Sequence, residues 1–350
     1  MVFSGIKPLY YECFFKYLFL KRPLIPIVKN ITFVERNKKC TIMKIVFLEP
    51  LGLSVEKIER ECDNLRRQGH EVVIYGDRCP EKNIERATDA DIVVESNMPL
   101  RKDFFDACPN VKMLSIAFTG LDHIDIEECE RRGILVNNAA GYSTEAVAEE
   151  VICMMIGLYR HIVENDKITR SCKGVSLSPG REIAGKTVGV VGLGAIGQRV
   201  SKLAQAFGCK VIAWNRTSKE VEGVTQVDKE TLFKESDIIT LHVALNNETR
   251  DFVSATEINL MKESAIIINA ARGPVVNTND IAKALKENRI AGAAIDVYDT
   301  EPPVAENNPL LSVPNTMLLP HIGFATEEAF ELRLGIVVGN IERYLLNNRM

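Results

Sequence analysis

Polar side chains follow three apolar runs in the C-terminal half of the chain. Arg272 comes shortly after one run, Asp296 and Glu301 follow a second, and His321 follows a third. A histidine can exchange a proton near neutral pH, and an arginine fork can hold a carboxylate. Singly, these residues have ordinary explanations as a surface arginine, a solvated turn carboxylate and a hydrogen-bonded core histidine. Together, each at the end of an expected strand, they indicate a ligand site.

A second candidate site is the glycine-rich segment KTVGVVGLGAIGQRV, residues 186–200. Gly192, Gly194 and Gly197 have GxGxxG spacing between an apolar strand pattern and a helical pattern. In a dinucleotide site, the first glycine makes the tight turn, the second lets the backbone approach a pyrophosphate, and the third lets the helix pack on the strand. The free N–H groups that begin the helix favour a phosphate. A strand before the motif and a helix after it favour a dinucleotide site over an ordinary glycine turn.

The elements that must position these residues are strands and helices that alternate from residue 44 onward. Strands are expected at residues 44–48, 71–75, 91–95, 112–117 and 134–137, with a helix at 55–68. A second set of strands is expected at residues 188–191, 210–214, 238–242, 265–269 and 293–297. Strands separated by helices imply parallel sheets with right-handed crossovers. The expected fold class is α/β, with two Rossmann-like doubly wound parallel-sheet domains that bind ligands at the carboxyl ends of their strands.

Two long helices define the expected domain boundaries. Residues 144–162 read as one helix, with Ser143 or Thr144 as N-cap, that leads into the glycine motif. Residues 327–346 read as a final helix that packs back on the first domain. We therefore expect one domain at residues 43–143 plus 324–350 and a dinucleotide-binding domain at 144–323. Residues 1–42 lack the pattern, and we interpret them as an extension, disordered or not native, with Met43 as the natural start.

Composition narrows the classes of partner. The chain has 350 residues and a net charge of −4, which gives no reason to expect nucleic acid as a partner. Its nine cysteines are scattered without a CxxC pair. This pattern favours a reducing cytoplasm over a disulfide framework or a metal site. Because no apolar run is long enough to span a bilayer, we expect no membrane partner.

Six segments together resemble the D-isomer-specific 2-hydroxyacid dehydrogenases. They are GLDHID, AVAEEVICMMIGLYR, GLGAIGQ, NAARGPVVN, AAIDVYDTEPP and LLPHIGFAT, and the resemblance runs from about residue 43 to the C-terminus. It implies an oxidoreductase that transfers a hydride between a nicotinamide cofactor and a 2-oxo acid or D-2-hydroxy acid. It also implies two lobes with a cleft between them, a substrate lobe built from both ends of the chain, and a homodimer.

The resemblance also implies roles for individual residues. Arg272, Glu301 and His321 would be catalytic, and Asp296 would lie beside the nicotinamide. The residues expected to bind the cofactor are Thr144, Gly192, Gly194, Ala195, Ile196, Gly197, Asn215, Arg216, Thr217, His242, Val243, Ala244, Ala270, Ala271, Arg272, Asp296, His321 and Gly323. The residues expected to bind the substrate are Phe118, Thr119, Gly120, Arg272 and His321.

Several positions depart from the family pattern. Asn215 stands where many members have an aspartate that binds the adenosine ribose, and Arg216, Thr217 and Ser218 follow it. The missing carboxylate and the added arginine favour NADP(H), with NAD(H) as the alternative. In the LHxPL segment, Ala244 replaces the usual proline, a change that backbone contacts to the cofactor should survive.

Other features bear on the substrate. Ile116 stands where phosphoglycerate dehydrogenases often have an arginine, Phe118 replaces a common glycine, and no regulatory domain follows in the sequence. We therefore expect an uncharged 2-oxo acid, with glyoxylate or hydroxypyruvate as candidates. The alternatives are a phosphoglycerate dehydrogenase-like enzyme and a cofactor-sensing module like the corepressors of this fold. A formate dehydrogenase is disfavoured because those enzymes pair their histidine with glutamine, where this chain has Glu301.

Overall fold

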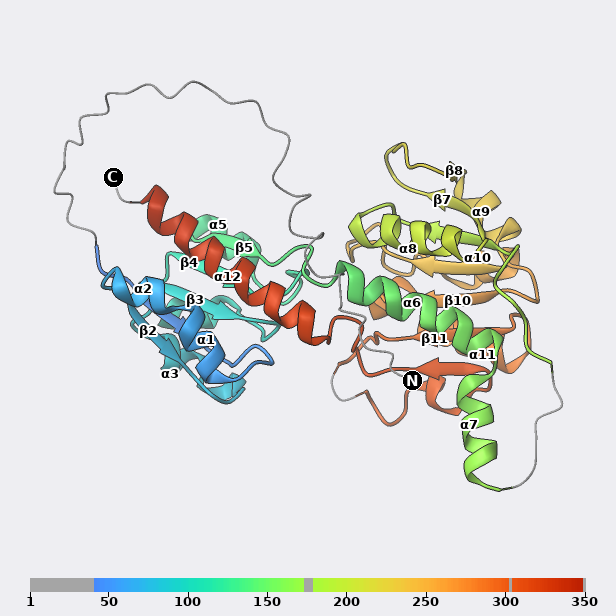
Figure 1. Cartoon of the computed structure of the whole chain (residues 1–350), viewed down its shortest axis with the longest axis horizontal. Helices are drawn as coiled ribbons and strands as arrows, with labels where there is room; N and C mark the ends of the chain where they lie inside the picture. The colour runs from blue at the N-terminus through green and yellow to red at the C-terminus, as the bar shows by residue number, and fades with distance from the viewer. Residues whose placement is uncertain (1–40, 173–178, 302–303, 349–350) are drawn as a thin grey trace, which may run out of the picture. The chain divides into compact units, whose positions relative to one another are not determined.

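The computed structural model describes residues 41–172, 179–301 and 304–348 (Figure 1). These residues form a five-stranded sheet in the order β2-β1-β3-β4-β5 and a seven-stranded sheet in the order β12-β11-β10-β9-β6-β7-β8. All strand pairs are parallel, which confirms the expected fold class. The interpretation of residues 1–42 as an extension falls almost wholly outside the described residues.

The first sheet alternates with short helices. Its strands are β1 (Lys44–Phe47), β2 (Glu71–Ile74), β3 (Ile92–Glu95), β4 (Met113–Ile116) and β5 (Leu135–Asn138). Its helices are α1 (Val55–Glu61), α2 (Asp63–Arg67), the 3₁₀ turn η1 (Pro80–Lys82), α3 (Asn83–Ala87), α4 (Lys102–Ala107) and α5 (Ile126–Arg132). The central strands β3 and β4 are buried throughout, as expected for continuous apolar runs covered on both faces.

Two expected helices are interrupted. The helix expected at residues 55–68 divides at Cys62, whose ψ of −1° departs from the helical value of about −42°. Ile58 and Leu65, on either side of the break, are both buried. The helix expected at residues 144–162 ends at Tyr159 as α6 (Thr144–Tyr159). His161 has a left-handed φ of 50°, which no α-helix can continue through, and α7 (Ile162–Arg170) follows with no buried residue.

The second sheet carries the glycine motif. Its strands are β6 (Thr187–Val191), β7 (Lys210–Trp214), β8 (Val224–Gln226), β9 (Ile238–Leu241), β10 (Ile266–Asn269), β11 (Gly292–Ile295) and β12 (Thr316–Leu318). Its helices, besides α6 and α7, are α8 (Ala195–Ala206), α9 (Lys229–Glu235), α10 (Ala255–Leu260), α11 (Thr278–Lys286), and the 3₁₀ turns η2 (Gly273–Val275) and η3 (Pro309–Ser312). Strand β8 was not predicted, because a three-residue edge strand is too short to show a periodic pattern.

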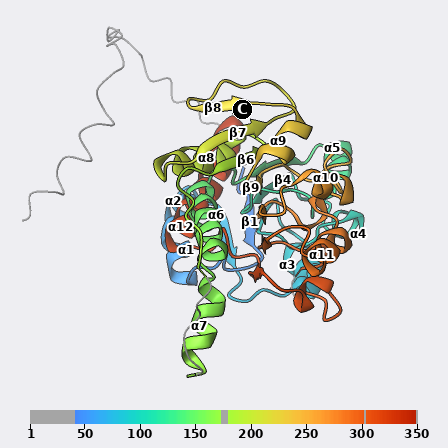
Figure 2. The same ribbon diagram turned by 90° about the vertical axis from the view of Figure 1, so that its right-hand side faces the viewer.

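The strand order places a crevice at the glycine motif. From β6 the chain continues to β7 on one side and then returns to β9 on the other, so the strand order reverses between β6 and β9. Ligands of open parallel sheets bind at such a reversal, outside the carboxyl ends of the strands. Helix α6 packs against α8 (Figure 2). It also packs against β10, β11 and β12 of this sheet.

The C-terminal helix α12 (Glu327–Asn347) packs on the first sheet, as the sequence predicted (Figure 1). The Ser115 hydroxyl of β4 donates a hydrogen bond to the carbonyl of Val337 at 3.2 Å. The buried Arg333 donates to the carbonyls of Ala117 and Leu51. The first sheet and α12 share one apolar core, whereas the second sheet has a core on each face. The exact domain boundaries remain our interpretation.

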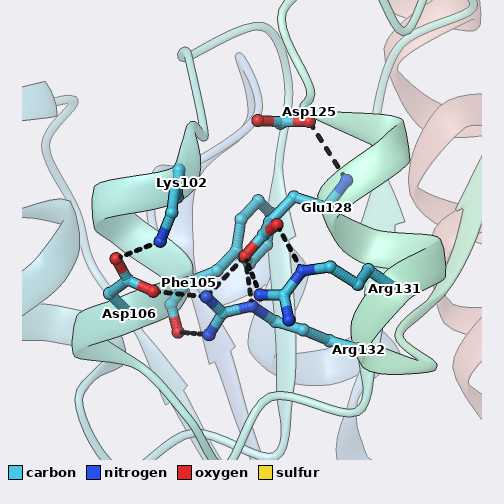
Figure 3. A network of polar contacts seen from close by, with 7 residues as sticks. All are labelled: Lys102, Phe105, Asp106, Asp125, Glu128, Arg131 and Arg132. Atoms are coloured by element: carbon cyan, nitrogen blue, oxygen red, sulfur yellow. Dashed lines mark hydrogen bonds and ion pairs between the residues drawn. The ribbon is translucent and has the colours of Figure 1, made fainter.

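A polar network joins α4 to α5 in the first domain (Figure 3). Asp125 caps α5 by accepting a hydrogen bond from the backbone N–H of Glu128 at 3.1 Å. The Glu128 carboxylate accepts hydrogen bonds from Arg131 and Arg132, and Arg132 also reaches Asp106 of α4. Hydrogen bonds from these two guanidinium groups lower the pKa of Glu128 to about 2. The network fixes α5 directly after the loop at residues 118–124.

Two features are absent from the described part of the chain. No helix there has both the length and the apolar character needed to cross a bilayer. No group of three or more His, Cys, Asp or Glu side chains in the same residues is placed to hold a metal ion.

Candidate active site

Neighbouring parallel strands bring Arg272, Asp296 and His321 to the same edge of the second sheet. These residues follow the carboxyl ends of β10, β11 and β12, which pair in that order. The buried side chain of Asn269 holds the turn after β10, because its amide donates to the carbonyl of Arg272 at 2.9 Å and its oxygen accepts from the N–H of Ala271. The residues that sequence analysis selected are therefore spatial neighbours.

His321 is oriented by a carboxylate. Its Nδ1 contacts Oε2 of Glu301, and the other Glu301 oxygen accepts a hydrogen bond from the N–H of Tyr298. The two side chains are 23% and 18% exposed, so this pair is only partly screened by water. Because Nδ1 is engaged with Glu301, Nε2 is the ring atom with which a substrate would exchange a proton.

Asp296 holds the backbone that follows His321. One carboxyl oxygen accepts from the N–H of Ile322 at 2.8 Å, and the other accepts from the N–H of Gly323 at 2.9 Å. Burial raises the pKa of Asp296, and these two hydrogen bonds act in the opposite direction. Asp296 thus fixes the loop on which the histidine stands.

Arg272 meets the first domain at Asp122. Its Nε donates to a carboxyl oxygen of Asp122 at 2.8 Å, and its Nη1 donates to the carbonyl of Ala271. The guanidinium also lies 5.8 Å from the centre of the Phe118 ring. A side chain at Gly120 would overlap Nη2 of Arg272. The GLDHID segment therefore helps to position Arg272 through Asp122, a residue for which sequence analysis assigned no role.

A cavity of about 400 Å³ unites the expected substrate loop with the strand ends. Phe118, Thr119 and Gly120 line it together with Arg272 and His321. Further cofactor-binding candidates that line it are Ile196, His242, Val243, Ala244, Ala270, Ala271, Asp296 and Gly323. The Phe118 ring lies edge-on to His321, with the ring centres 6.0 Å apart, so this aromatic residue forms one wall of the cavity.

A wider cavity of about 870 Å³ also contains Phe118, Arg272 and His321 in its lining. Glu301 lines this cavity rather than the smaller one, and Arg78 and Arg101 add two cationic side chains to it. Sequence analysis missed both arginines, because they follow different strands of the first sheet and no local motif connects them.

The three glycines of the motif occupy distinct environments. Gly192 has a φ of +95°, and a Cβ there would stand 2.7 Å from the carbonyl oxygen of His242. A Cβ at Gly197 would overlap the carbonyl oxygen of Gly192. A Cβ at Gly194, the N-cap of α8, would meet nothing within 4 Å. The backbone is therefore open at the helix start, where a pyrophosphate needs close approach.

A smaller cavity of about 240 Å³ continues from the glycine turn toward the end of β7. Asn215 lines it but uses its side chain within the turn, accepting from the N–H of Leu193 and donating to the carbonyl of Thr217. Arg216 lies 3.1 Å from the carboxylate of Glu248, and both side chains are more than 70% exposed. Glu248 was missed because it lies in the loop after β9, far from the motif in sequence.

Some expected cofactor residues lie outside these cavities. Gly192, Gly194, Asn215, Arg216, His242, Val243 and Ala244 line the 240 Å³ cavity. Thr144, Ala195, Gly197 and Thr217 line neither that cavity nor the one of about 400 Å³. At the start of α6, Ser143 and Val147 contribute to the lining where Thr144 was expected. Ser143 and Val147 are four residues apart, a spacing that places two side chains on the same side of a helix.

The fold and the site together define a nicotinamide-dependent oxidoreductase. Residues 152–323 match the family model described as "D-isomer specific 2-hydroxyacid dehydrogenase, NAD binding domain". The chain is 43% identical over 252 residues to a glyoxylate reductase of Thermococcus litoralis, which covers 69% of this chain and 76% of the relative. It is 33% identical over 317 residues to a hydroxypyruvate reductase of Blautia hydrogenotrophica, covering 87% and 97%.

Solved structures agree with these sequence matches. A structure of an acyclic imino acid reductase in complex with NADPH and D-arginine superposes with a TM-score of 0.80 at 30% identity, covering 87% of this chain and 98% of the other. The chain belongs to the D-isomer-specific 2-hydroxyacid dehydrogenase family. This confirms the resemblance inferred from the sequence, and the chain is an oxidoreductase that acts on a CH–OH group with a nicotinamide cofactor.

Proposed function

We propose that this chain reduces glyoxylate or hydroxypyruvate, small 2-oxo acids without a second charged group, to the corresponding 2-hydroxy acids. The observation that carries the proposal is that Arg272, His321 and the loop at residues 118–120 line one cavity. Two of the relatives described above are named for these two substrates. The aromatic wall formed by Phe118 suits a small substrate.

The chain's own residues would bind and protonate the substrate. Arg272 would hold the carboxylate and polarise the 2-oxo group, and the backbone N–H groups of residues 118–120 would meet the same carboxylate. The bound nicotinamide supplies the hydride that reduces the carbonyl carbon. The Nε2 proton of His321 passes to the carbonyl oxygen as negative charge develops there. Through its contact with Nδ1, Glu301 would fix the orientation of the ring so that Nε2 faces the substrate. The same groups in reverse would oxidise a 2-hydroxy acid.

A panel of 2-oxo acids tests this proposal. Turnover would be measured with glyoxylate, hydroxypyruvate, pyruvate and 3-phosphohydroxypyruvate. We expect the highest kcat/KM for glyoxylate or hydroxypyruvate. A preference for the phosphorylated acid would instead support the phosphoglycerate dehydrogenase-like alternative, which Arg78 and Arg101 in the wider cavity favour. Cofactor binding without turnover of any member would support a cofactor-sensing module.

We further propose that NADP(H) is the preferred cofactor. Asn215 places no carboxylate at the ribose, and Arg216 is exposed beside the cavity, where it can reach a 2′-phosphate. The open backbone at Gly194 fits the pyrophosphate. Glu248 favours the alternative, NAD(H), because its carboxylate already pairs with Arg216 and could accept hydrogen bonds from a ribose.

Two variants separate these cofactors. Arg216→Ala should lower kcat/KM for NADPH by about tenfold with little change for NADH. A tenfold effect is at the lower end of the range for losing a charge-assisted hydrogen bond, and we expect this value because the Arg216 side chain is exposed. Glu248→Gln should raise kcat/KM for NADPH by freeing Arg216. A wild type that prefers NADH, or an Arg216→Ala variant that keeps its NADPH preference, would show that the assignment is wrong.

A homodimer in the cytoplasm completes the proposal. The family resemblance supports the dimer. The nine scattered cysteines without a CxxC pair support a cytoplasmic location, because cysteines stay reduced there. Light scattering should give twice the 39.0 kDa mass of one chain. A single-chain mass at micromolar concentration would contradict the dimer.

A further inference from the structure

A second carboxyl group lies behind Asp296 and has no role in the mechanism above. It belongs to Glu150 of α6, the helix that packs against β10, β11 and β12. Its Oε2 is buried and receives no hydrogen bond from the described residues. A buried carboxyl oxygen without a donor is costly. The burial of Oε2 of Glu150 without a hydrogen-bond donor therefore requires an explanation.

The position of Gly323 shows what Oε2 of Glu150 faces. A Cβ on Gly323 would overlap Oε2 of Glu150 and would stand 3.2 Å from Oδ2 of Asp296. The two oxygens thus border the same small space, which is left free because residue 323 has no side chain. Two ionised carboxylates at such a site repel each other, and one shared proton removes the repulsion. A proton on Glu150 also supplies the missing donor.

The surrounding groups indicate which carboxyl keeps the proton. Asp296 accepts two backbone hydrogen bonds, which favour its ionised form. Glu150 has no such bonds, and burial, followed by the charge of Asp296, raises its pKa to about 8. His321 and Glu301 are the charged groups that act on Asp296. On α8, which packs against α6, Arg199 is paired with Glu145. Glu149, the preceding residue on α6, is exposed.

We propose that Glu150 is a positioning residue that keeps a proton at neutral pH and shares it with Asp296, so that one negative charge rather than two lies beside the nicotinamide site. Loss of this proton at alkaline pH adds a second charge. Because the oxidised nicotinamide ring is positively charged and the reduced ring is neutral, the added charge favours the oxidised cofactor. The enzyme would therefore shift toward oxidation of the hydroxy acid as pH rises. This inference rests on the cofactor site of the proposed function.

Cofactor affinity measured against pH tests the proposal. The Kd of NADPH would be followed by its fluorescence and that of NADP⁺ by competition, with NADH and NAD⁺ in parallel, from pH 6.5 to 9.5. In the wild type, the Kd of the reduced cofactor divided by the Kd of the oxidised cofactor should rise several-fold, up to about tenfold, as pH increases over this range. The ratio should stay flat in Glu150→Gln, which cannot ionise, and should rise as in the wild type in the exposed control Glu149→Gln.

Thermal unfolding supplies a readout that needs no cofactor. Folded Glu150 keeps a proton that the unfolded chain loses above about pH 4.5, so the wild type loses stability from there up to about pH 8. The Tm of Glu150→Gln relative to the wild type should therefore rise across this window. Glu150→Leu, which also cannot ionise, should behave alike and serves if the glutamine variant does not fold.

Four outcomes would overturn the inference. A flat Kd ratio in the wild type, or a rise that persists in Glu150→Gln, would show that Glu150 does not set the charge at the site. A Tm difference that does not change with pH would show that Glu150 is already ionised at neutral pH. Failure to bind either cofactor pair at any pH would overturn the proposed function together with this inference, whereas binding with a flat ratio overturns the inference alone.

Discussion

At the scale of single residues, the site depends on side chains whose partners fix their orientation. His321 is held by Glu301, the loop that follows it is held by Asp296, and Arg272 is held by Asp122. Each contact places a group with several rotatable bonds in one geometry before substrate arrives. Such preorganisation lowers the barrier because the protein does not reorganise during the reaction.

His321→Ala and Arg272→Ala should each lower kcat by about 10²–10⁴-fold. The first removes the proposed proton donor, and the second removes the cation proposed to hold the carboxylate and polarise the carbonyl. Neither residue belongs to the glycine turn, so the Kd of the reduced cofactor should change little. Arg250→Ala, in an exposed segment, is the control. Turnover of His321→Ala close to that of the wild type would contradict the mechanism.

Gly120→Ala should raise KM for the 2-oxo acid more than it changes the cofactor Kd. The new methyl group would overlap the guanidinium of Arg272 and displace it from Asp122. Gly335→Ala in α12 is the matched control, since a Cβ there meets nothing within 4 Å and alanine favours a helix. Equal KM values for the two variants would show that Arg272 relaxes without loss of substrate binding.

At the scale of elements, short helices around the first sheet are joined by polar contacts as well as by apolar packing. The network centred on Glu128 connects α4 to α5 (Figure 3). Because α5 starts one residue after Asp125, this network limits the movement of the loop at residues 118–124, which carries the substrate-binding candidates.

Glu128→Ala should lower the Tm at neutral pH by removing the acceptor shared by Arg131 and Arg132. The pKa of Glu128 is lowered to about 2 in the folded chain, so its stabilisation is complete above about pH 4.5 and is lost as pH falls toward 2. The Tm difference from the wild type should therefore shrink on acidification. Glu130→Ala, an exposed neighbour, is the control. A Tm difference independent of pH between 2 and 5 would contradict the ionic role.

At the scale of the whole molecule, the site needs both sheets. The second sheet supplies Arg272, Asp296 and His321, and the first supplies Asp122 and the loop at residues 118–120. Helix α12 returns the chain to the first sheet, where Arg333 connects it to the carbonyls of Leu51 and Ala117. The two ends of the described chain therefore stabilise the same domain.

A shortened chain that starts at Met43 should fold and turn over like the full chain. The regular strand and helix pattern begins at that point, and β1 follows directly. Expression yield, Tm and kcat/KM would be compared between the two forms. Loss of activity or folding would show that residues 1–42 are needed by the rest of the protein.

The sequence by itself determined the fold class, the family and the residues at the ends of the central strands. Buried parallel strands are continuous apolar runs, and the polar residue that ends each run is visible without coordinates, as at Arg272, Asp296 and His321. The three glycines were equally visible because their spacing is local. The ends of the helices were not visible in the sequence. The breaks at Cys62 and His161 come from the backbone angles of these two residues, and no residue pattern marks those angles.

Only the tertiary structure decided which distant residues meet. Asp122 reaches Arg272 across 150 positions of sequence, Glu248 reaches Arg216, and Glu150 faces Asp296. Strand order and helix packing set these contacts, and a local pattern carries no information about either. The shared space between Glu150 and Asp296 exists only because Gly323 has no side chain there, and that coincidence of three segments appears once the chain is folded.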